Sequence, residues 1–392
     1  MTRSLTSSEK PLQAQQSTDT VILEHQHFQQ LLDVLRGKGY QPIGPTIRDS
    51  AIVYDELTSV ADLPIGWTDE QEASTYRLKK RQDKAFFGYN VGPQSWKQFL
   101  FPPRIRLFAA KKNGKGWEIE TDPSNTPAMR YAFVGVRSCE LKAIEIQDKV
   151  FNNGEYLDPI YKVRREGIFI VAVNCTQAGG TCFCASMGTG PKVRGAFDLA
   201  LTEVIDEAVS YFVVEIGSER GAEVISEVPH RSAEKHHTDA ADRIVENTAQ
   251  RMGRTLDIND LRELLLSHIE SPHWDDVARR CLTCTNCTLV CPTCFCSTIE
   301  DVTDLNGERA ERWRRWDSCF TVDYARVAGG NFRLSPRARY RHWLTHKLAS
   351  WIEQFGTWGC VGCGRCITWC PVGIDITTEV DAIRNSQAKN QG

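Results

Sequence analysis

The sequence has no long apolar run and no excess of charge of either sign. Its longest apolar stretch, Ile168–Val173, is far shorter than the roughly 20 residues that a membrane-spanning helix needs. It has 47 lysines and arginines against 50 aspartates and glutamates, a net charge of −3, which excludes a polycationic nucleic-acid binder of the histone type. The polar N-terminus lacks the apolar core of a signal peptide. We therefore expect a cytoplasmic protein whose thiols stay reduced.

The common substrate-binding motifs are also missing. No G-x-G-x-x-G follows a predicted strand, and neither the phosphate loop G-x4-G-K-[ST] nor G-x-S-x-G nor H-E-x-x-H occurs. We therefore assign no catalytic residue.

What the sequence does contain is an unusual number of cysteines, 15 among 392 residues. In a secreted protein this number would predict disulfides, but in a reducing compartment it indicates metal or redox chemistry.

Eight of the cysteines form two copies of one motif. The copies are Cys281-x2-Cys284-x2-Cys287-x3-Cys291-Pro292 and Cys360-x2-Cys363-x2-Cys366-x3-Cys370-Pro371. In such motifs three cysteines bind one iron-sulfur cluster and the fourth binds the other cluster. The spacing therefore predicts one 4Fe-4S cluster on Cys281, Cys284, Cys287 and Cys370, and a second on Cys360, Cys363, Cys366 and Cys291. A zinc site is the alternative, but its usual pattern is a pair of C-x2-C knuckles or a mixture of Cys and His.

Four further cysteines are predicted to meet at one edge of a sheet. Tyr131–Val136 and Gly167–Val173 have the pattern of buried strands, and a helical pattern over Glu140–Val150 lies between them, which predicts a βαβ unit with parallel strands. Cys139 and Cys175 follow these strands, and Cys182 and Cys184 lie in a glycine-rich loop. Open α/β sheets bind ligands at the carboxyl ends of their strands, so we expect a third 4Fe-4S cluster here. Buried free cysteines are the alternative.

Three cysteines remain, Cys294, Cys296 and Cys319. Thr293-Cys-Phe-Cys296 repeats the pattern of Thr181-Cys-Phe-Cys184. The three could bind a fourth cluster, lie near the first cluster without binding it, or act as alternative ligands.

The pattern along the chain predicts an α+β protein, with an N-terminal mixed α/β domain and a C-terminal α-helical ferredoxin domain. We expect a disordered tail over 1–20, the α/β domain over 21–226, a linker or surface helix with solvated histidines over 227–254, and the ferredoxin domain over 255–392.

Further predictions are a helix over Val21–Leu35, strands and loops over Gln41–Pro103, and a hairpin of Phe197–Val204 with Val209–Ile216. In the last domain we expect helices over Leu261–Ile269, from Ser335-Pro336 to Gly356, and over Ile376–Ile383.

Two basic stretches interleaved with aromatic residues, Arg312–Trp316 and Arg337–Arg341, lie in this last domain. We interpret them as a solvated helix face or as positive charge beside an anionic cluster, in preference to a nucleic-acid site.

The motifs together resemble the beta subunit of cytoplasmic NiFe hydrogenases of the sulfhydrogenase type, a 4Fe-4S dicluster family that also includes the dicluster subunit of anaerobic sulfite reductase. The resemblance covers the chain from about residue 25. It is carried by Gly135-Val-Arg-Ser-Cys-Glu140, Thr181–Cys184, Cys281–Cys296, Arg315-Trp-Asp-Ser-Cys319 and Cys360–Cys366. Glu140 stands where relatives commonly have an aspartate.

The resemblance implies an electron-transfer subunit of an oxidoreductase complex that is not itself catalytic. Its expected partners are the small and large subunits of a NiFe hydrogenase together with a flavin- and NAD(P)-binding subunit, with no nucleic acid and no membrane. The alternative is a sulfite or sulfur reductase, in which the spare thiols could handle sulfur directly.

Overall fold

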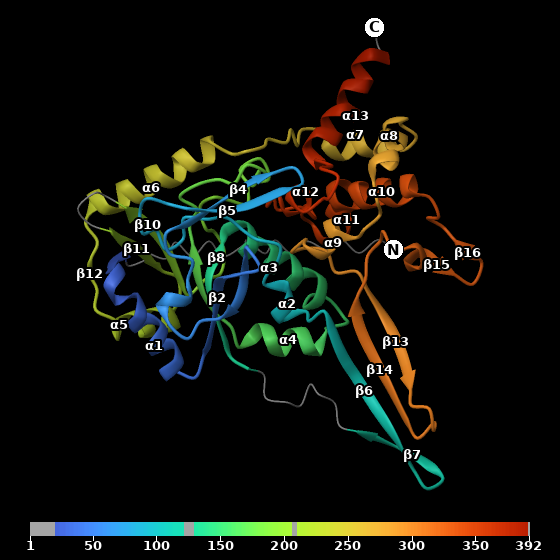
Figure 1. The fold of residues 1–392 in the computed structure, drawn as a ribbon, viewed down its shortest axis with the longest axis horizontal. Coiled ribbons are helices and arrows are strands. Elements are labelled where there is room, and N and C mark those ends of the chain that lie inside the picture. Colours follow the sequence, from blue (N-terminus) through green and yellow to red (C-terminus); the bar gives the residue numbers. More distant parts are fainter. Residues whose placement is uncertain (1–19, 121–128, 206–209, 391–392) are drawn as a thin grey trace, which may run out of the picture.

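An eight-stranded mixed sheet forms the centre of the N-terminal part of the chain in the computed structural model (Figure 1). The structure describes residues 20–120, 129–205 and 210–390. The order in the sheet is β12-β1-β11-β10-β9-β8-β2-β3. The strands are β1 (Thr20–Glu24), β2 (Gln41–Arg48), β3 (Ala51–Glu56), β8 (Tyr131–Arg137), β9 (Phe169–Val173), β10 (Leu199–Ile205), β11 (Ser210–Ile216) and β12 (Arg231–Ser232).

The predicted βαβ unit is confirmed. Strands β8 and β9 pair in parallel, and the helices α3 (Ser138–Phe151) and α4 (Pro159–Glu166) connect them. Strands β2 and β10 extend the parallel region on either side. The hairpin of β10 and β11 is antiparallel, as expected. The carboxyl ends of the parallel strands consequently lie at one edge of the sheet.

Both faces of this sheet are covered by helices. Ala132 and Val134 share a core with residues of α1 (Phe28–Gly37) and α5 (Glu219–Ser226), whereas Phe133 and Val136 pack with residues of α3 and α4. A strand between two covered faces buries every side chain, which is why β8 and β9 have continuous apolar sequences.

The predicted helix over Val21–Leu35 is wrong in its first part. Val21, Ile22 and Leu23 belong to β1, which pairs with β11, and a single turn (η1, His25–His27) separates it from α1. Ile22 packs with α6 (Lys235–Gln250) and Leu23 packs in the core that contains α1. This alternation between two faces favours a strand. The predicted disordered tail lies, apart from Thr20, outside the described residues.

The segment over Gln41–Pro103 consists of strands and loops, as predicted. Besides β2 and β3 it contains a turn (η2, Val60–Asp62), the hairpin of β4 (Trp67–Glu72) with β5 (Thr75–Lys80) and the short helix α2 (Lys97–Leu100).

Residues 227–254 contain helix α6, which packs on β10 and β11 through Ala241 and Ile244. The expectation that all histidines here are solvated is wrong for His237. Its ring is buried and accepts a hydrogen bond from the backbone N–H of Glu234, at 3.0 Å from Nδ1.

The C-terminal part contains the three predicted helical regions and further helices that were not predicted, around a core of its own. They are α7 (Leu261–Ser267), α8 (His273–Arg280), α9 (Asn286–Leu289), α10 (Pro336–Thr345), the π-helical turn η5 (His346–Ser350), α11 (Trp351–Phe355), α12 (Arg365–Thr368) and α13 (Ile376–Asn390). The side chain of Ser335 caps α10 at the N–H of Ala338, and Gly356 ends α11 in a left-handed conformation. Among the described residues, no helix is both long and apolar enough to cross a membrane.

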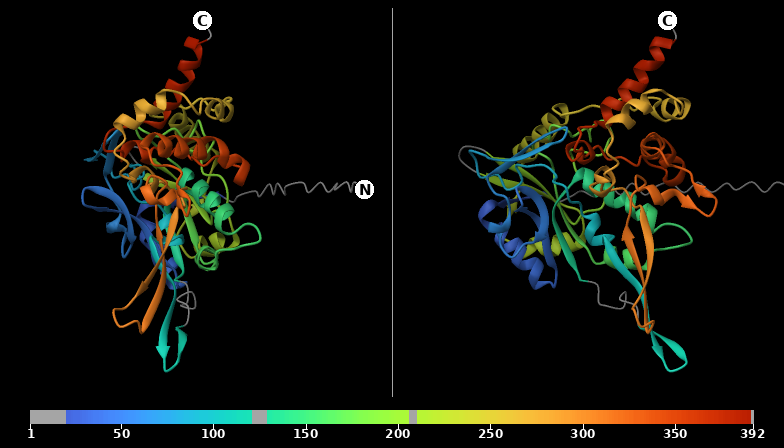
Figure 2. Two further views of the ribbon diagram at one scale, coloured as in Figure 1. Left: turned by 90° about the vertical axis from the view of Figure 1, so that its right-hand side faces the viewer. Right: turned by 45° about the vertical axis from the view of Figure 1, so that its right-hand side comes forward.

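The expectation that the C-terminal domain is all-helical is wrong for two segments. Residues 297–316 form the hairpin β13 (Ser297–Thr303) and β14 (Arg309–Trp316), which pairs with β6 (Arg104–Asn113) and β7 (Gly116–Glu120) in a projecting arm (Figures 1 and 2). Arg312–Trp316 is therefore a strand and not a helix. Its two tryptophans, Trp313 and Trp316, belong to a residue type that is enriched in strands. A short turn (η4, Val322–Ala325) and the pair β15 (Arg326–Val327) and β16 (Gly330–Asn331) follow.

Candidate metal centres

The structure brings the cysteines together in groups. We define the first thiol group as Cys281, Cys284, Cys287 and Cys370, the second as Cys291, Cys360, Cys363 and Cys366, and the third as Cys139, Cys175, Cys182 and Cys184.

The first thiol group lines one cavity below Tyr340 and Trp343. Cys281 directly follows α8, Cys287 lies in α9, and Cys370 lies two residues after the end of α12. Burial raises the pKa of Cys287 well above its ordinary value, and the nearby thiols of Cys281, Cys370 and Cys284 raise it further. Such mutual repulsion of thiolates is relieved when a positively charged metal centre binds them.

Backbone N–H groups donate to the sulfur atoms of this group. The N–H of Thr283 lies 3.4 Å from the Sγ atom of Cys281, and that of Ile374 lies 3.3 Å from the Sγ atom of Cys370. Hydrogen bonds to the sulfurs are one of the means by which proteins tune iron-sulfur clusters, so this environment suits such ligands.

In the second thiol group Cys291, Cys360 and Cys363 are buried and Cys366 is half-buried. Burial raises the pKa of Cys360 to about 12, against the opposing effect of the Lys347 ammonium. Burial likewise raises the pKa of Cys366, with further contributions from Cys360, Cys363 and Cys291. As in the first group, a backbone N–H, that of Gly362, donates to the first sulfur, at 3.4 Å from the Sγ atom of Cys360.

The third thiol group gathers at the carboxyl edge of β8 and β9, as the topology predicted. Cys139 lies in the first turn of α3, Cys175 follows β9, and the other two lie in the loop after it. Burial raises the pKa of Cys139, and Cys184 and Cys363 raise it further. Burial also raises the pKa of Cys182 to about 12, and Cys363 contributes to this rise. Because Cys363 of the second group raises the pKa of both Cys139 and Cys182, the third group lies next to the second.

Several hydrogen bonds fix the second motif on the loop of the third group. The N–H of Phe183 donates to the carbonyl of Gly362 at 2.8 Å, and the hydroxyl of Thr189 donates to the carbonyl of Val361 at 2.6 Å. The hydroxyls of Thr181 and Thr368 share a hydrogen bond of 2.7 Å. The two groups are thus held in one rigid region.

A buried ion pair connects the same two motifs. Glu140, next to Cys139, accepts a hydrogen bond from Arg365, which lies between Cys363 and Cys366. The carboxylate also accepts from the hydroxyl of Tyr54, at 2.7 Å, and from the indole of Trp96, at 3.1 Å. Sequence reasoning did not identify this pair, although both residues lie inside the cysteine motifs.

Cys294, Cys296 and Cys319 are not part of the three groups: Cys294 lies beside Cys291, and Cys319 lies beside Cys296. Interaction with the Cys294 thiol lowers the pKa of Cys291, and interaction with the Cys319 thiol lowers the pKa of Cys296 to about 6. Two buried lysines, Lys97 and Lys347, lie next to them. Lys97 falls in the segment for which the sequence predicts only strands and loops.

The arginines of the two basic stretches are mostly paired with carboxylates. Arg312 pairs with Asp301, and Arg337 and Arg341 both pair with Glu270. Arg339 lies close enough to the first thiol group for its charge to oppose the rise that burial causes in the pKa of Cys281.

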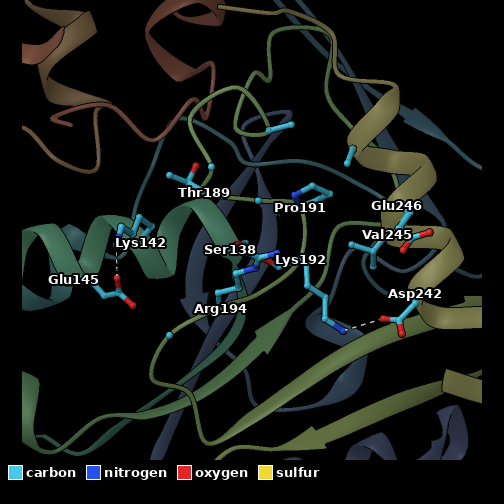
Figure 3. A pocket seen from close by; sticks show the side chains of 15 residues that line it. Ser138, Lys142, Glu145, Thr189, Pro191, Lys192, Arg194, Asp242, Val245 and Glu246 are labelled. Carbon is cyan, nitrogen blue, oxygen red and sulfur yellow. Dashed lines mark hydrogen bonds and ion pairs between the residues drawn. The ribbon is translucent and has the colours of Figure 1, made fainter. Parts of the chain in front are cut away.

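A cavity of about 800 Å³ lies next to the loop that carries Cys184 of the third thiol group (Figure 3). Ser138 and Gly190 line it, and a Cβ atom at Gly190 would lie 3.0 Å from the Sγ atom of Cys184. Two of its lysines are paired with carboxylates, Lys142 with Glu145 and Lys192 with Asp242. Gly190 thus separates the cavity from the Sγ atom of Cys184.

In the described part of the chain, no three His, Cys, Asp or Glu side chains form a site for a single metal ion. The first thiol group instead surrounds a cavity.

Comparison with known proteins agrees with the cysteine motifs. Residues 280–374 match the family model of a 4Fe-4S dicluster domain. No solved structure matches the chain. Over 367 residues the chain is 30% identical to the beta subunit of sulfhydrogenase 2 from Pyrococcus furiosus, an alignment that covers 93% of this chain and 98% of that relative. The chain therefore belongs to the family of sulfhydrogenase beta subunits and carries a 4Fe-4S dicluster domain.

Proposed function

We propose that this chain is the iron-sulfur electron-transfer component of a multisubunit cytoplasmic NiFe hydrogenase. It would relay electrons between the hydrogenase module and a flavin- and NAD(P)-binding subunit. The observation that carries the proposal is the succession of three groups of four thiols through the molecule. The name of the Pyrococcus relative supports a hydrogenase over a sulfite reductase.

In this proposal each thiol group holds one 4Fe-4S cluster. The donor set fits, because each group offers four thiols, and backbone N–H groups already donate to Cys281, Cys360 and Cys370. When bound, such a cluster takes up and releases single electrons at a potential set by charge, hydrogen bonding and solvent exposure.

The groups lie in a fixed order. The pKa of Cys287 in the first group is raised mainly by burial, and Cys291 of the second group raises it further. On the other side, Cys363 of the second group acts on Cys139 and Cys184 of the third. The second group therefore lies between the other two, as the middle position of a relay requires.

Both ends of this succession approach the surface. Cys284 of the first group is exposed, and the cavity of Figure 3 lies next to the loop that carries Cys184 of the third group. A relay needs one exposed end for each partner, and we assign the two partner subunits to these ends.

The surrounding residues orient the thiols and balance their charge. The guanidinium of Arg137 opposes the rise that burial causes in the pKa of Cys175, and Arg365 does the same for Cys363. Arg137 is itself held by the carbonyls of Phe87 and Tyr89, at 2.8 and 2.7 Å. These fixed charges stabilise thiolates in a site from which water is largely excluded.

Iron and acid-labile sulfide analysis after anaerobic purification tests the cluster number. Two clusters correspond to about eight irons per chain and three to about twelve. Cys182→Ser should remove about four irons and leave the dicluster domain loaded. Zinc without sulfide would contradict the proposal.

The partners are tested by anaerobic co-purification of the full chain. We expect both a flavin-containing protein and a NiFe protein. A siroheme protein in their place would overturn the hydrogenase assignment and would leave the electron-transfer role intact.

A further inference from the structure

The outer part of the projecting arm has one apolar face. Residues directly opposite each other on antiparallel strands lie on the same face of a sheet, and the register places Ile119 opposite Ala110 and Ala110 opposite Ala310. Trp117 and Phe108 each lie two positions along their strand from one of these residues, so they share the face. The three large residues are exposed, Ile119 by 73%, Trp117 by 54% and Phe108 by 38%. We call the surface formed by these five residues the apolar arm face.

The opposite face of the same strands carries charged side chains that are already paired. Glu120 lies opposite Ala109, which in turn lies opposite Glu311. Arg309 forms ion pairs with both carboxylates, and Arg106 forms another with Glu311. This charged face is suited to water. In an antiparallel sheet with one apolar and one charged face, the apolar face is the one that packs against another layer.

The inner end of this face is covered by the chain itself. Arg314 lies four residues after Ala310 and thus on the same face, where it forms an ion pair with Asp158 at the start of α4. Its guanidinium lies 4.6 Å from the centre of the Phe101 ring. The outer part of the arm projects beyond the described helices (Figures 1 and 2). An exposed apolar surface of this kind marks a place where another molecule binds.

The charges of the arm indicate what kind of molecule covers it. Residues 104–120 and 297–316 contain nine lysines and arginines against seven aspartates and glutamates. On the apolar arm face itself, Arg312 pairs with Asp301, whereas Lys112 forms no ion pair within the described residues. A surface that is apolar and has an excess of positive charge complements an apolar patch bordered by carboxylates.

A second copy of this chain is a poorer match for the same surface. In a two-fold dimer the apolar arm face would lie against the same face of the other copy. Such a contact would bring two positively charged arms together, and like charges across an interface are unfavourable. A different protein with acidic residues around its apolar patch avoids this repulsion.

We propose that the apolar arm face is the docking surface for another subunit of the same complex, which presents an apolar patch bordered by aspartates and glutamates. The proposal rests on the proposed function in one respect, since it requires partner subunits. It assigns the attachment of one of them to the arm, which contains no residue of the three thiol groups. The attachment and the clusters can therefore be changed separately.

Cross-linking within the anaerobically purified complex identifies what covers this face. The photoreactive residue benzoylphenylalanine at position 117 should cross-link to the flavin-containing or the NiFe protein, or to a siroheme protein if that is the partner. The cross-linked peptide should contain apolar residues with carboxylates next to them. Cross-links to a second copy, to the chain itself or to lipid would overturn the proposal, as would the absence of any cross-link.

Position 302 provides the matched control. Val302 is 45% exposed and lies opposite Glu311, on the charged face of the arm. Benzoylphenylalanine at this position should not form the cross-link that position 117 forms. Identical cross-links from both positions would contradict docking through the apolar arm face.

Single substitutions measure how much the face contributes. Ile119→Asp places a charge in the apolar contact and should reduce the amount of the cross-linked subunit in the purified complex by about tenfold or more. Lys112→Glu should reduce it by a smaller factor, and added salt should weaken this effect because it screens the repulsion between carboxylates. Val302→Asp, on the charged face, should leave the complex unchanged.

The iron content separates this proposal from the proposed function. Because Ile119 is exposed, Ile119→Asp should leave iron and sulfide per chain as they are in the unsubstituted chain. Full retention of every partner subunit in both Ile119→Asp and Lys112→Glu would overturn the docking surface and leave the electron-transfer role intact. An unsubstituted chain without iron and sulfide would instead refute the proposed function.

Discussion

The two ferredoxin motifs have identical spacing but very different surroundings. In each, a short helix, α9 or α12, begins five residues after the first cysteine, and a backbone N–H donates to that cysteine at 3.4 Å. Leu282 in the first motif is 61% exposed, whereas Val361 at the matching position is 2% exposed. The same local geometry is thus used once at the surface and once in the interior.

The backbone shows the same contrast. Both motifs have left-handed residues at their third and fifth positions: Thr283 and Thr285 in the first, Gly362 and Gly364 in the second. A Cβ atom at Gly362 would lie 2.6 Å from the N atom of Cys184, and one at Gly364 would lie 2.4 Å from the carbonyl oxygen of Thr181. Only the second motif therefore requires glycine, because another loop packs directly against it.

The residue before the third cysteine differs as well. Asn286 in the first motif makes an exposed hydrogen bond to the carbonyl of Trp369, at 3.2 Å. Its counterpart Arg365 is fully buried against Glu140. The Arg365–Glu140 pair thereby joins the second motif to helix α3, whereas Asn286 of the first motif bonds to another residue of the C-terminal part. We infer that the first group is the peripheral end of the relay and the second its internal part.

The largest expected difference between the motifs concerns Arg365. Arg365→Met leaves Glu140 buried without its cation, which should lower the free energy of unfolding by about 3 to 5 kcal/mol. Asn286→Ala, the matched change in the first motif, should cost within about 0.5 kcal/mol. Chemical denaturation of the two variants would measure this difference, and equal losses would contradict it.

A smaller difference is expected for the left-handed residues. Gly364→Ala should destabilise the chain by about 2 to 4 kcal/mol, because left-handed strain adds to the clash with Thr181. Thr285→Gly in the first motif should instead stabilise it by about 1 kcal/mol, since glycine relieves that strain. Thermal unfolding of both variants tests the prediction. A tolerated alanine at 364 would show that the loop of Thr181 is not rigid.

The smallest expected effect is a difference in thiol reactivity of the metal-free chain. Alkylating reagents attack the thiolate, which forms only when the pH approaches the pKa. Since burial raises the pKa of Cys360 to about 12, this thiol should stay protonated and unlabelled at about pH 8, and labelling should rise with pH. The exposed Cys284 should be labelled under the same conditions. Mass spectrometry after timed alkylation distinguishes them, and equal labelling of the two thiols would contradict the contrast.

Much of this organisation could be predicted from local patterns. Continuous apolar runs predicted β8 and β9, and Ser335-Pro336 predicted the start of α10. The cysteine spacing predicted the groups that now lie together, including Cys370 with Cys281. The strand and helix predictions succeeded because each depends on residues close in sequence or on the fixed handedness of a βαβ connection.

Other features depended on distant partners and could not be predicted in this way. Val21–Leu23 continues the apolar spacing of the helix that follows but pairs with β11, and Arg312–Trp316 becomes a strand because β6 lies beside it. The ion pair of Glu140 with Arg365 joins residues 225 positions apart. Long-range pairing overrides local preference in all three cases.

The sequence by itself indicated the kind of cofactor, because the cysteine spacing is that of a 4Fe-4S dicluster domain and the family resemblance agrees. Only the tertiary structure decided which of two identical motifs is buried, which thiols adjoin which, and that two lysines far apart in the chain lie beside the same unassigned cysteines. Burial and the balance of charge are properties of packing, and packing brings together residues that no local pattern relates.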